Sequence, residues 1–323
     1  MSQSGAQRTT LFVATRLIEP VRAELAAAFE TTFASSADWR SELARDDAGV
    51  EALLVSLDSK LGAREIEALP DGIRVLATYS VGTDHIDLEA ARARSLVVLN
   101  TPGVLADSVA ENAILLMLGA ARRATESIEL LRSRRWTGWS PTQLVGVQLS
   151  GRTLGIVGMG DIGSRVATRA SALGMRILYS NRKRLPDDRP HAAGFRASPA
   201  ELVAESDVLL LACPSTAETR GLVDGTLLES ARPGLLVVNI ARGDLVVDDA
   251  LVAALRDGRV RGAGLDVFAG EPDVHPAYFE LPNVFMLPHI GSSTIEARLG
   301  MGRILIEGIR RWARGEAIAN RVV

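Results

Sequence analysis

The stretch TLGIVGMGDIGSR, residues Thr153 to Arg165, is the clearest structural signal in this sequence. It begins with an apolar run typical of a buried strand, breaks into a glycine-rich turn, and continues into a helical pattern that reaches Leu173. A strand, a G-x-G-x-x-G turn and a helix in this order are typical of a unit that binds a dinucleotide. An ordinary glycine turn is the alternative, and the flanking strand and helix favour the dinucleotide interpretation.

Each glycine of this turn has a separate expected role. Gly158 permits the tight turn, Gly160 lets the backbone approach a pyrophosphate, and Gly163 lets the helix pack closely against the strand. The helix N-terminus adds unpaired N–H groups and a partial positive charge, both of which favour phosphate. The residues predicted to lie against the phosphates are Gly158, Met159, Gly160, Asp161, Ile162 and Gly163.

Length and composition narrow the class of protein. The chain has 323 residues, enough for two domains, and its net charge of -3 and 4% aromatic content argue against a nucleic-acid binder. The longest apolar run, Ala113 to Ala121, is too short to cross a bilayer, and the polar N-terminus shows no secretory signal. The single cysteine, Cys213, excludes a disulfide framework and a multi-cysteine metal site. We expect a cytoplasmic enzyme or binding protein, with no metal site, nucleic acid or membrane as partner.

The first hundred residues alternate between short apolar runs and helical patterns. Predicted strands cover residues 11–14, 52–55, 75–78 and 96–99, and predicted helices cover 21–29, 63–69 and 88–94. This alternation indicates an α/β unit with a mainly parallel sheet. Ser80, Val81 and Gly82 follow the third of these strands, at the edge where open α/β sheets bind ligands. The segment is either an anion-binding turn or a plain connection between strand and helix.

The pattern changes after Asn100. Ser108 and Glu111 have the spacing of a capping box, which predicts a long helix from Ser108 to about Arg134. The arginines in its later part suit a helix C-terminus and a solvated face. Next comes the loop WTGWSP from Trp136 to Pro141, whose tryptophans either anchor a core or project into a neighbouring subunit.

A second alternating series follows the glycine turn. Predicted strands cover residues 153–157, 176–179, 208–211, 235–240, 262–266 and 284–287, and predicted helices cover 162–173, 199–204, a turn near 227, 249–255 and 294–315. Ser198 to Glu201 is a second capping box, with Pro199 at the first helical position. Six strands with intervening helices make a complete dinucleotide domain with a doubly wound parallel sheet.

The end of the second strand of this series bears on the cofactor. NAD-binding units usually carry Asp or Glu there to bind the ribose hydroxyls, whereas this chain has the run Ser180, Asn181, Arg182, Lys183 and Arg184. A hydroxyl, an amide and cations attract the extra phosphate of NADP, which a carboxylate would repel. The sequence predicts NADP(H) as the preferred cofactor, with NAD(H) possible; a basic surface loop is the alternative.

Charged side chains follow three later strands of the same series. Arg242 lies in the segment NIARG, Asp266 and Glu271 lie in GLDVFAGEP, and His289 lies in LPHIG. A cation, carboxylates and an imidazole are thus predicted at one edge of the sheet, where the nicotinamide ring of the dinucleotide should lie.

These motifs in this order resemble the D-isomer-specific 2-hydroxyacid dehydrogenase family, over nearly the whole chain. The family's catalytic arginine, glutamate and histidine match Arg242, Glu271 and His289. The resemblance implies two Rossmann-like α/β domains, in which a dinucleotide-binding domain (residues 101–289) is inserted into a flavodoxin-like substrate domain (residues 1–100 plus 290–323), with a cleft between them.

The resemblance also implies a reaction, the reduction of a 2-oxo acid by hydride transfer from NAD(P)H. His289 would supply the proton, Glu271 would favour its charged form, and Arg242 would bind the substrate carboxylate and carbonyl oxygen. The backbone N–H groups of the Ser80–Gly82 loop would hold the carboxylate. Asp266 would hold the nicotinamide carboxamide, and further cofactor contacts are expected at Cys213, Pro214, Thr219, Ile240, Ala241 and Gly291.

Within this family, the basic run and the WTGW segment resemble the NADPH-using glyoxylate/hydroxypyruvate reductases. That resemblance implies a homodimer in which Trp139 reaches the partner's substrate pocket, although an interface role without substrate contact is equally open. Other readings are a D-3-phosphoglycerate dehydrogenase, a broader 2-oxo acid reductase, and an NAD(H)-sensing binding protein similar to the C-terminal-binding corepressors.

Overall fold

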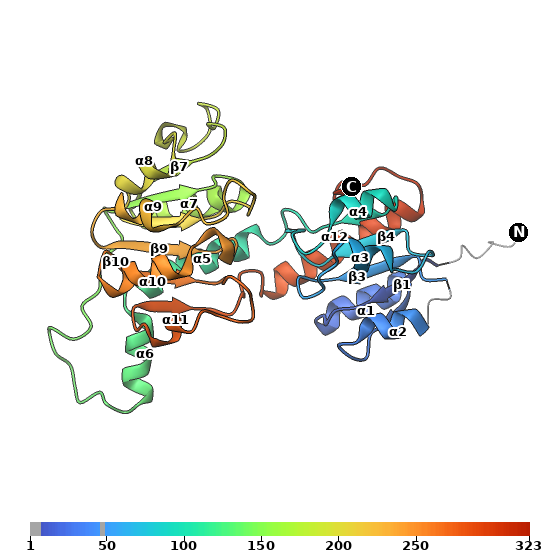
Figure 1. Ribbon diagram of the computed structural model, residues 1–323, viewed down its shortest axis with the longest axis horizontal. Coiled ribbons are helices and arrows are strands. Elements are labelled where there is room, and N and C mark those ends of the chain that lie inside the picture. The colour runs from blue at the N-terminus through green and yellow to red at the C-terminus, as the bar shows by residue number, and fades with distance from the viewer. Residues whose placement is uncertain (1–7, 46–48) are drawn as a thin grey trace, which may run out of the picture. The chain divides into compact units, whose positions relative to one another are not determined.

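The computed structural model describes residues 8–45 and 49–323, and the chain divides into two compact units (Figure 1). Unit 1 comprises Met1–Leu105 and Ser293–Val323, and unit 2 comprises Ala106–Ser292. Unit 2 therefore lies between the two parts of unit 1 in the sequence. Each unit has its own parallel sheet, which confirms the predicted α/β fold class.

The sheet of unit 1 has five parallel strands in the order β2-β1-β3-β4-β5, the order of flavodoxin-like folds. They are β1 (Thr10–Val13), β2 (Glu30–Phe33), β3 (Ala52–Val55), β4 (Val75–Thr78) and β5 (Val97–Leu99). The prediction omitted β2 because this edge strand, ETTF, is only partly buried and carries a weak apolar signal.

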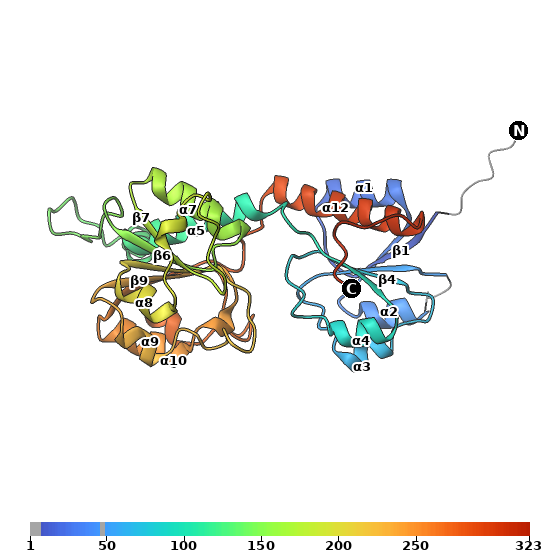
Figure 2. The same cartoon turned by 90° about the horizontal axis from the view of Figure 1, so that it is seen from above.

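Helices cover both faces of this sheet (Figure 2). One face carries α1 (Glu19–Ala28) and the C-terminal helix α12 (Ile295–Ala313); the other carries α2 (Trp39–Arg45), α3 (Ala63–Glu67) and α4 (Leu88–Ala93). Gly302 allows α12 to approach α1 closely, since a Cβ there would lie 2.7 Å from Val21. The Tyr79 hydroxyl donates to the Arg298 carbonyl, so the C-terminal helix is fastened to the end of β4.

The sheet of unit 2 has six parallel strands in the order β11-β10-β9-β8-β6-β7. They are β6 (Thr153–Val157), β7 (Arg176–Ser180), β8 (Val208–Leu211), β9 (Leu235–Asn239), β10 (Val260–Leu265) and β11 (Val284–Met286). An isolated parallel bridge joins Tyr179 of the edge strand β7 to Phe195, which lies where the usual dinucleotide-binding order has its third strand. The six predicted strands are confirmed, and the order of strands reverses between β6 and β8.

Helices also cover both faces of the second sheet (Figure 2). One face carries α5 (Ala106–Ala121) and α7 (Asp161–Ala172), and the other carries α8 (Pro199–Ala204), α9 (Gly225–Glu229) and α10 (Asp248–Arg256). The shorter α6 (Ala124–Arg132) and α11 (Ala277–Glu280) complete the unit. Because all strands are parallel, the loops at their carboxyl ends meet at one edge of the sheet. Among the described residues, no helix is both long and apolar enough to cross a membrane.

The predicted single helix from Ser108 to Arg134 is wrong, because it is two helices. Helix α5 ends at Ala121, and Arg123 adopts a left-handed conformation (φ 54°) that turns the chain into α6. The Arg123 guanidinium pairs with Glu126 at 2.6 Å, and the Thr125 hydroxyl donates to the Val284 carbonyl at 2.7 Å. The bond from Thr125 holds the start of α6 beside β11, and the Arg123–Glu126 pair joins the turn residue to α6.

The capping box predicted at Ser108 is also wrong. Helix α5 begins at Ala106, so Ser108 lies inside it, and the Ser108 hydroxyl donates to the carbonyl of Gly291 at 2.6 Å. The cap at Ser198 is confirmed, because its hydroxyl accepts from the Glu201 N–H; the Glu201 carboxylate accepts in turn from the N–H of Ala197, one residue before the cap. The two signatures look alike in sequence, and only the tertiary contact of Ser108 separates them.

Candidate functional site

The glycine turn connects β6 to α7 at the point where the strand order reverses. Gly158 has φ +101°, and a Cβ there would lie 2.6 Å from the Cys213 nitrogen; a Cβ on Gly163 would lie 2.2 Å from the Gly158 oxygen. A Cβ on Gly160, in contrast, would meet no described atom within 4 Å. The fold itself therefore requires Gly158 and Gly163, whereas Gly160 borders open space of the kind a pyrophosphate needs.

The end of β7 is hydrogen-bonded to this turn. The Gly158 N–H donates to the Ser180 carbonyl at 3.0 Å, and the Met159 N–H donates to Oδ1 of Asn181 at 2.7 Å. The Ser180 side chain is buried. The acceptor end of the Asn181 amide thus holds the glycine turn, and its donor end, Nδ2, is the end that can meet a phosphate.

The basic run continues as an exposed loop. Arg182, Lys183 and Arg184 are all exposed, and Arg184 pairs with Asp187 at 3.0 Å. The first carboxylate after β7 is therefore engaged by a cation of its own loop. The Thr216 hydroxyl and, to a smaller extent, the charge of Arg182 hold the pKa of Glu218 below its usual range, so the loops after β7 and β8 are neighbours.

The loop after β8 contains three of the predicted cofactor contacts. Cys213 is buried beside the glycine turn, and burial raises the pKa of its thiol, which stays neutral. The Thr219 hydroxyl donates to the Pro214 carbonyl at 2.8 Å and accepts from the Thr216 N–H at 2.8 Å. The loop is thus closed by its own hydrogen bonds next to Gly158.

Arg242 is positioned by a buried asparagine that the prediction did not include among the site residues. Asn239, at the end of β9, donates from Nδ2 to the Arg242 carbonyl at 2.8 Å and accepts at Oδ1 from the Ala241 N–H at 3.0 Å. A Cβ on Gly243 would lie 1.8 Å from the Phe268 carbonyl carbon, so the turn is pressed against the segment that leads to Glu271. The sequence carries one signal for Asn239, which is a polar residue at the end of an otherwise apolar strand.

Glu271 and His289 form a hydrogen-bonded pair. Oε2 of Glu271 lies 2.7 Å from Nδ1 of His289, and Oε1 accepts from the Phe268 N–H at 2.7 Å. Burial raises the pKa of Glu271, but the hydrogen bonds from His289 and Phe268, with the nearby positive charges, outweigh burial and lower it overall. Glu271 is therefore ionised near neutral pH, Nδ1 of His289 donates to it, and Nε2 is the nitrogen that can exchange a proton.

Asp266 holds the backbone that follows His289. Its Oδ1 accepts from the Ile290 N–H and its Oδ2 accepts from the Gly291 N–H, both at 2.8 Å. The residue is 2% exposed, and burial raises the pKa of its carboxyl although the two N–H groups act in the opposite direction. The structure thus gives Asp266 a structural contact in addition to the cofactor contact expected from sequence.

In unit 1, the Ser80–Gly82 loop has its carbonyl groups satisfied. The Ser80 carbonyl accepts from the Thr101 N–H at 3.0 Å, and the Val81 carbonyl accepts from the Asn100 side-chain amide at 2.9 Å. The Gly82 carbonyl accepts from the Ser80 hydroxyl at 2.7 Å. Within the described part of the chain, the N–H groups of Val81 and Gly82 make no hydrogen bond. Two unpaired neighbouring N–H groups are what a bound carboxylate needs.

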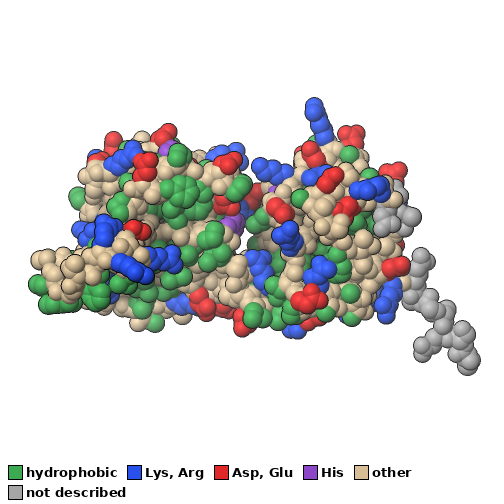
Figure 3. All heavy atoms as spheres, turned by 90° about the horizontal axis from the view of Figure 1, so that it is seen from below, with side chains coloured by type: hydrophobic (Ala, Val, Ile, Leu, Met, Phe, Trp, Pro, Cys, Tyr) green, Lys and Arg blue, Asp and Glu red, His purple; other side chains and the backbone are tan. Residues whose placement is uncertain are grey.

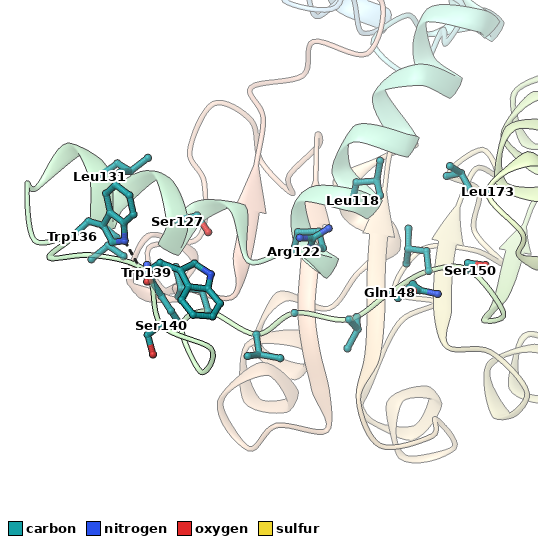
Figure 4. Close-up of a pocket in the computed structure, with 17 residues that line it drawn as sticks. Leu118, Arg122, Ser127, Leu131, Trp136, Trp139, Ser140, Gln148, Ser150 and Leu173 are labelled. Carbon is teal, nitrogen blue, oxygen red and sulfur yellow. Dashed lines mark hydrogen bonds between the residues drawn. The ribbon is translucent and has the colours of Figure 1, made fainter.

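Trp139 lies in the loop after α6, beside an open groove of about 960 Å³ (Figure 4). Apolar and basic side chains lie side by side on the surface at this end of unit 2 (Figure 3). The Trp136 indole donates to the Gln143 side chain at 3.3 Å, whereas Trp139 is 82% exposed. Leu118, Leu131 and Leu173 line the same groove (Figure 4).

The fold of unit 2 and the geometry of its loops together define a class of enzyme. A doubly wound parallel sheet places three features on loops at one edge. They are a glycine turn of the kind that binds phosphate, Arg242, and the hydrogen-bonded pair of Glu271 and His289. This combination is typical of oxidoreductases that transfer hydride with a nicotinamide dinucleotide and move a proton through a side chain.

Comparison with known proteins gives the family. The model of the D-isomer specific 2-hydroxyacid dehydrogenase NAD binding domain matches residues 114–291. The chain is 44% identical over 254 residues to the glycerate dehydrogenase of Hyphomicrobium methylovorum, covering 78% of this chain and 79% of that protein. The chain belongs to the D-isomer-specific 2-hydroxyacid dehydrogenase family and is an enzyme that uses a nicotinamide dinucleotide.

Solved structures agree with this family. A putative D-isomer specific 2-hydroxyacid dehydrogenase from Polaromonas sp. JS6 66 matches with a TM-score of 0.91 and 40% identity, covering 98% of this chain and all of that one. An NADPH-dependent glyoxylate/hydroxypyruvate reductase from Sinorhizobium meliloti, in complex with NADP and malonate, matches with a TM-score of 0.86 and 31% identity, covering 98% of this chain and 97% of that one.

Proposed function

We propose that this enzyme reduces a small 2-oxo acid, glyoxylate or hydroxypyruvate or both, to the D-2-hydroxy acid with NAD(P)H. The observation that carries the proposal is the Glu271–His289 pair, 2.7 Å apart, on the same edge of the sheet as the glycine turn. The similarity to a glycerate dehydrogenase and to a glyoxylate/hydroxypyruvate reductase supports this choice of substrate.

The residues divide the reaction between them. A nicotinamide dinucleotide held by the glycine turn and the loop after β7 would supply the hydride to the carbonyl carbon. Nε2 of His289 gives its proton to the carbonyl oxygen, and the ionised Glu271 stabilises the protonated ring through Nδ1. Arg242 binds the substrate carboxylate and carbonyl oxygen with its guanidinium, and the N–H groups of Val81 and Gly82 bind the carboxylate. One hydride and one proton convert the carbonyl to a hydroxyl, so atoms and charge balance.

For the cofactor, we propose a preference for NADPH, with NADH accepted more weakly. The open space beside Gly160 fits a pyrophosphate, and the loop after β7 offers Arg182, Lys183 and Nδ2 of Asn181 to a ribose phosphate. A charge-assisted hydrogen bond contributes about 1.5 to 3 kcal/mol, and about 1.4 kcal/mol is tenfold in affinity. The expected preference is at least tenfold.

The proposal includes a homodimer, because large apolar side chains including Leu131 and Trp139 are exposed along one groove of unit 2. Contiguous exposed apolar surface of this kind usually marks a contact with another protein surface. We assign it to a second copy of this chain. Whether Trp139 also contacts the partner's substrate stays open, and a cytoplasmic location stays a prediction.

The test is a steady-state assay of NADPH and NADH oxidation with glyoxylate, hydroxypyruvate, pyruvate and bulkier 2-oxo acids. We expect turnover of the two small acids, with kcat/KM at least about tenfold higher for NADPH. Replacing Arg182 and Lys183 with Ala should raise the KM for NADPH and leave that for NADH unchanged. Arg184→Ala is the matched control, because Arg184 already pairs with Asp187.

Two further variants test the reaction residues. His289→Ala should lower kcat by about 10²- to 10⁴-fold, the usual contribution of a positioned general acid. Arg242→Ala should lower kcat/KM for every 2-oxo acid. Near-normal turnover by either variant would reject the assigned roles. Absence of turnover by the unmodified protein with all four classes of acid would reject the proposed activity itself.

A further inference from the structure

The backbone of His289 is held in an unusual conformation. Its φ of 53° lies in the left-handed region, which is uncommon for residues other than glycine and strains the backbone. Such a conformation persists only where the surrounding structure fixes it. The residue carries the imidazole proposed as the proton donor, so whatever fixes this backbone also fixes the position of Nε2.

The contacts that hold the chain beyond His289 come from two separate elements. From the end of β10, Asp266 accepts the N–H groups of Ile290 and Gly291, both at 2.8 Å. From α5, the Ser108 hydroxyl donates to the carbonyl of Gly291 at 2.6 Å. The N–H and the C=O of Gly291 are thus both bound by side chains, and neither of these side chains belongs to the loop itself.

Ser108 does not behave like an ordinary helical serine. A serine inside a helix usually turns its hydroxyl to water or to the carbonyl one turn earlier. Here it reaches another segment 183 positions away in the sequence. The two surfaces are also in close contact, because a Cβ on Gly291 would lie 3.1 Å from Asp266 and 3.4 Å from Val109, the neighbour of Ser108.

We propose that Ser108 is a positioning residue for His289: its hydrogen bond to Gly291 holds the left-handed backbone, and with it the direction of Nε2. Glu271 fixes the other end of the imidazole through Nδ1, at 2.7 Å. Without the bond from Ser108, the loop can relax toward an ordinary φ, and the ring then turns about its contact with Glu271. This role of Ser108 rests on the proposed function, because Ser108 affects the reaction only by orienting His289, the proposed proton donor.

The kinetic test compares three variants. Ser108→Ala should lower kcat with glyoxylate and NADPH by roughly ten- to a hundredfold, because a misplacement of about 1 Å can cost a factor of that order. The KM for NADPH should change little, and Ser108→Thr, which keeps the hydroxyl, should restore most of the rate. Ser206→Ala is the control: the Ser206 hydroxyl is buried in the same unit and also donates to a backbone carbonyl at 2.6 Å, that of Leu202. It should keep the unmodified kcat.

A second readout does not depend on turnover. The resonances of the His289 ring, assigned by comparison with His289→Gln, report the Nδ1 hydrogen bond to Glu271, and they should broaden or shift in Ser108→Ala and stay unchanged in Ser206→Ala. A rate within about twofold of the unmodified enzyme for Ser108→Ala, or unchanged ring resonances, would overturn the proposal. If the unmodified protein reduces no 2-oxo acid, the proposed function fails, and the resonances still decide the role of Ser108.

Discussion

A single carboxylate, Glu271, fixes which nitrogen of the proposed proton donor can exchange a proton. Glu271 is ionised because its hydrogen bonds and the adjacent positive charges outweigh its burial and lower its pKa. The carboxylate can therefore only accept from Nδ1 of His289, which leaves Nε2 as the exchangeable position. In the proposed mechanism Glu271 positions His289 and stabilises its positive charge, so its loss should be visible both in catalysis and in the pH dependence of stability.

We predict that Glu271→Gln lowers kcat by roughly 10²-fold, the lower end of what a general acid contributes, because the neutral amide no longer stabilises the protonated imidazole. The pKa of Glu271 is lowered in the folded protein, so its stabilisation is present above the ordinary value of 4.5 and is lost as the pH falls through the lowered folded value. The free energy of unfolding should fall less steeply below pH 4.5 in the variant than in the unmodified protein. Since the pair is about one third exposed, the difference should stay below about 1 kcal/mol.

Asp266→Asn gives a second prediction for a single residue. Both oxygens of Asp266 accept backbone N–H groups, so an amide would turn a donor toward one of them. An unsatisfied buried group costs about 1 to 3 kcal/mol, and we expect the variant to lose that much stability together with most of its kcat. Asp207→Asn is the control, because Asp207 also accepts a backbone N–H, that of Thr153 at 2.8 Å, away from the proposed site. Denaturant unfolding should show a loss in both variants, and a normal kcat for Asp266→Asn would contradict the assignment.

How much of the site the sequence predicts depends on how local each signal is. The sequence could place Arg242, Glu271 and His289 at one edge of the sheet, because each follows an apolar strand in a short motif and parallel strands bring such positions together. The contacts of Asn239 and Ser108 could not be found, because they depend on which segment packs against the side chain. Ser108 in particular has the spacing of a helix cap, and only its distance to Gly291 shows its actual partner.

The same distinction holds for helices and strands. The predicted bounds of β3, β4, β6 and β8 coincide with the structure, because a fully buried strand is a continuous apolar run with abrupt ends. The end of α5 at Ala121 was missed, because helical propensity continues through the arginines that follow it. The turn at Arg123 is accompanied by the local Arg123–Glu126 ion pair and by the bond from Thr125 to Val284 in β11, and no local pattern contains the second contact.

The strand–turn–helix element around Gly158 gives a prediction in which two similar substitutions have different results. Gly160→Ala adds a methyl group to open space at a φ of -84°, which alanine adopts readily, so stability should change by less than about 1 kcal/mol while the KM for NADPH rises about tenfold or more. Gly163→Ala places a Cβ 2.2 Å from a backbone oxygen and should destabilise the protein. Thermal unfolding and cofactor titration of the two variants separate these effects. Unchanged NADPH binding by Gly160→Ala would place the pyrophosphate elsewhere.

For the whole molecule, the periodicity of strands and helices predicts the two parallel sheets and their connections, whereas the expected contact of Trp139 with a second copy comes from the family resemblance alone. Each sheet follows from alternating strands and helices, whose order in the sequence leaves few possible topologies. A surface that binds a second copy has no such periodic signal. It appears only when the structure shows apolar side chains that no other element covers, as at Leu131 and Trp139, which are 61% and 82% exposed.

The assembly prediction follows from that groove. Leu131→Asp places a charge among apolar side chains, so we expect the homodimer to dissociate into monomers in analytical ultracentrifugation, with each monomer folded and thermally stable on its own. Phe279→Asp is the matched control, because Phe279 is 70% exposed on α11 and does not line the groove.

The variant Trp139→Ala separates the two roles that are open for Trp139, contact with the partner's substrate and contact with the partner's surface. A dimer that loses efficiency on hydroxypyruvate while keeping it on glyoxylate would favour contact with the substrate. An equal effect on both acids, or weaker dimerisation alone, would favour an interface role. A monomeric unmodified protein would reject the assignment of this groove to a second copy.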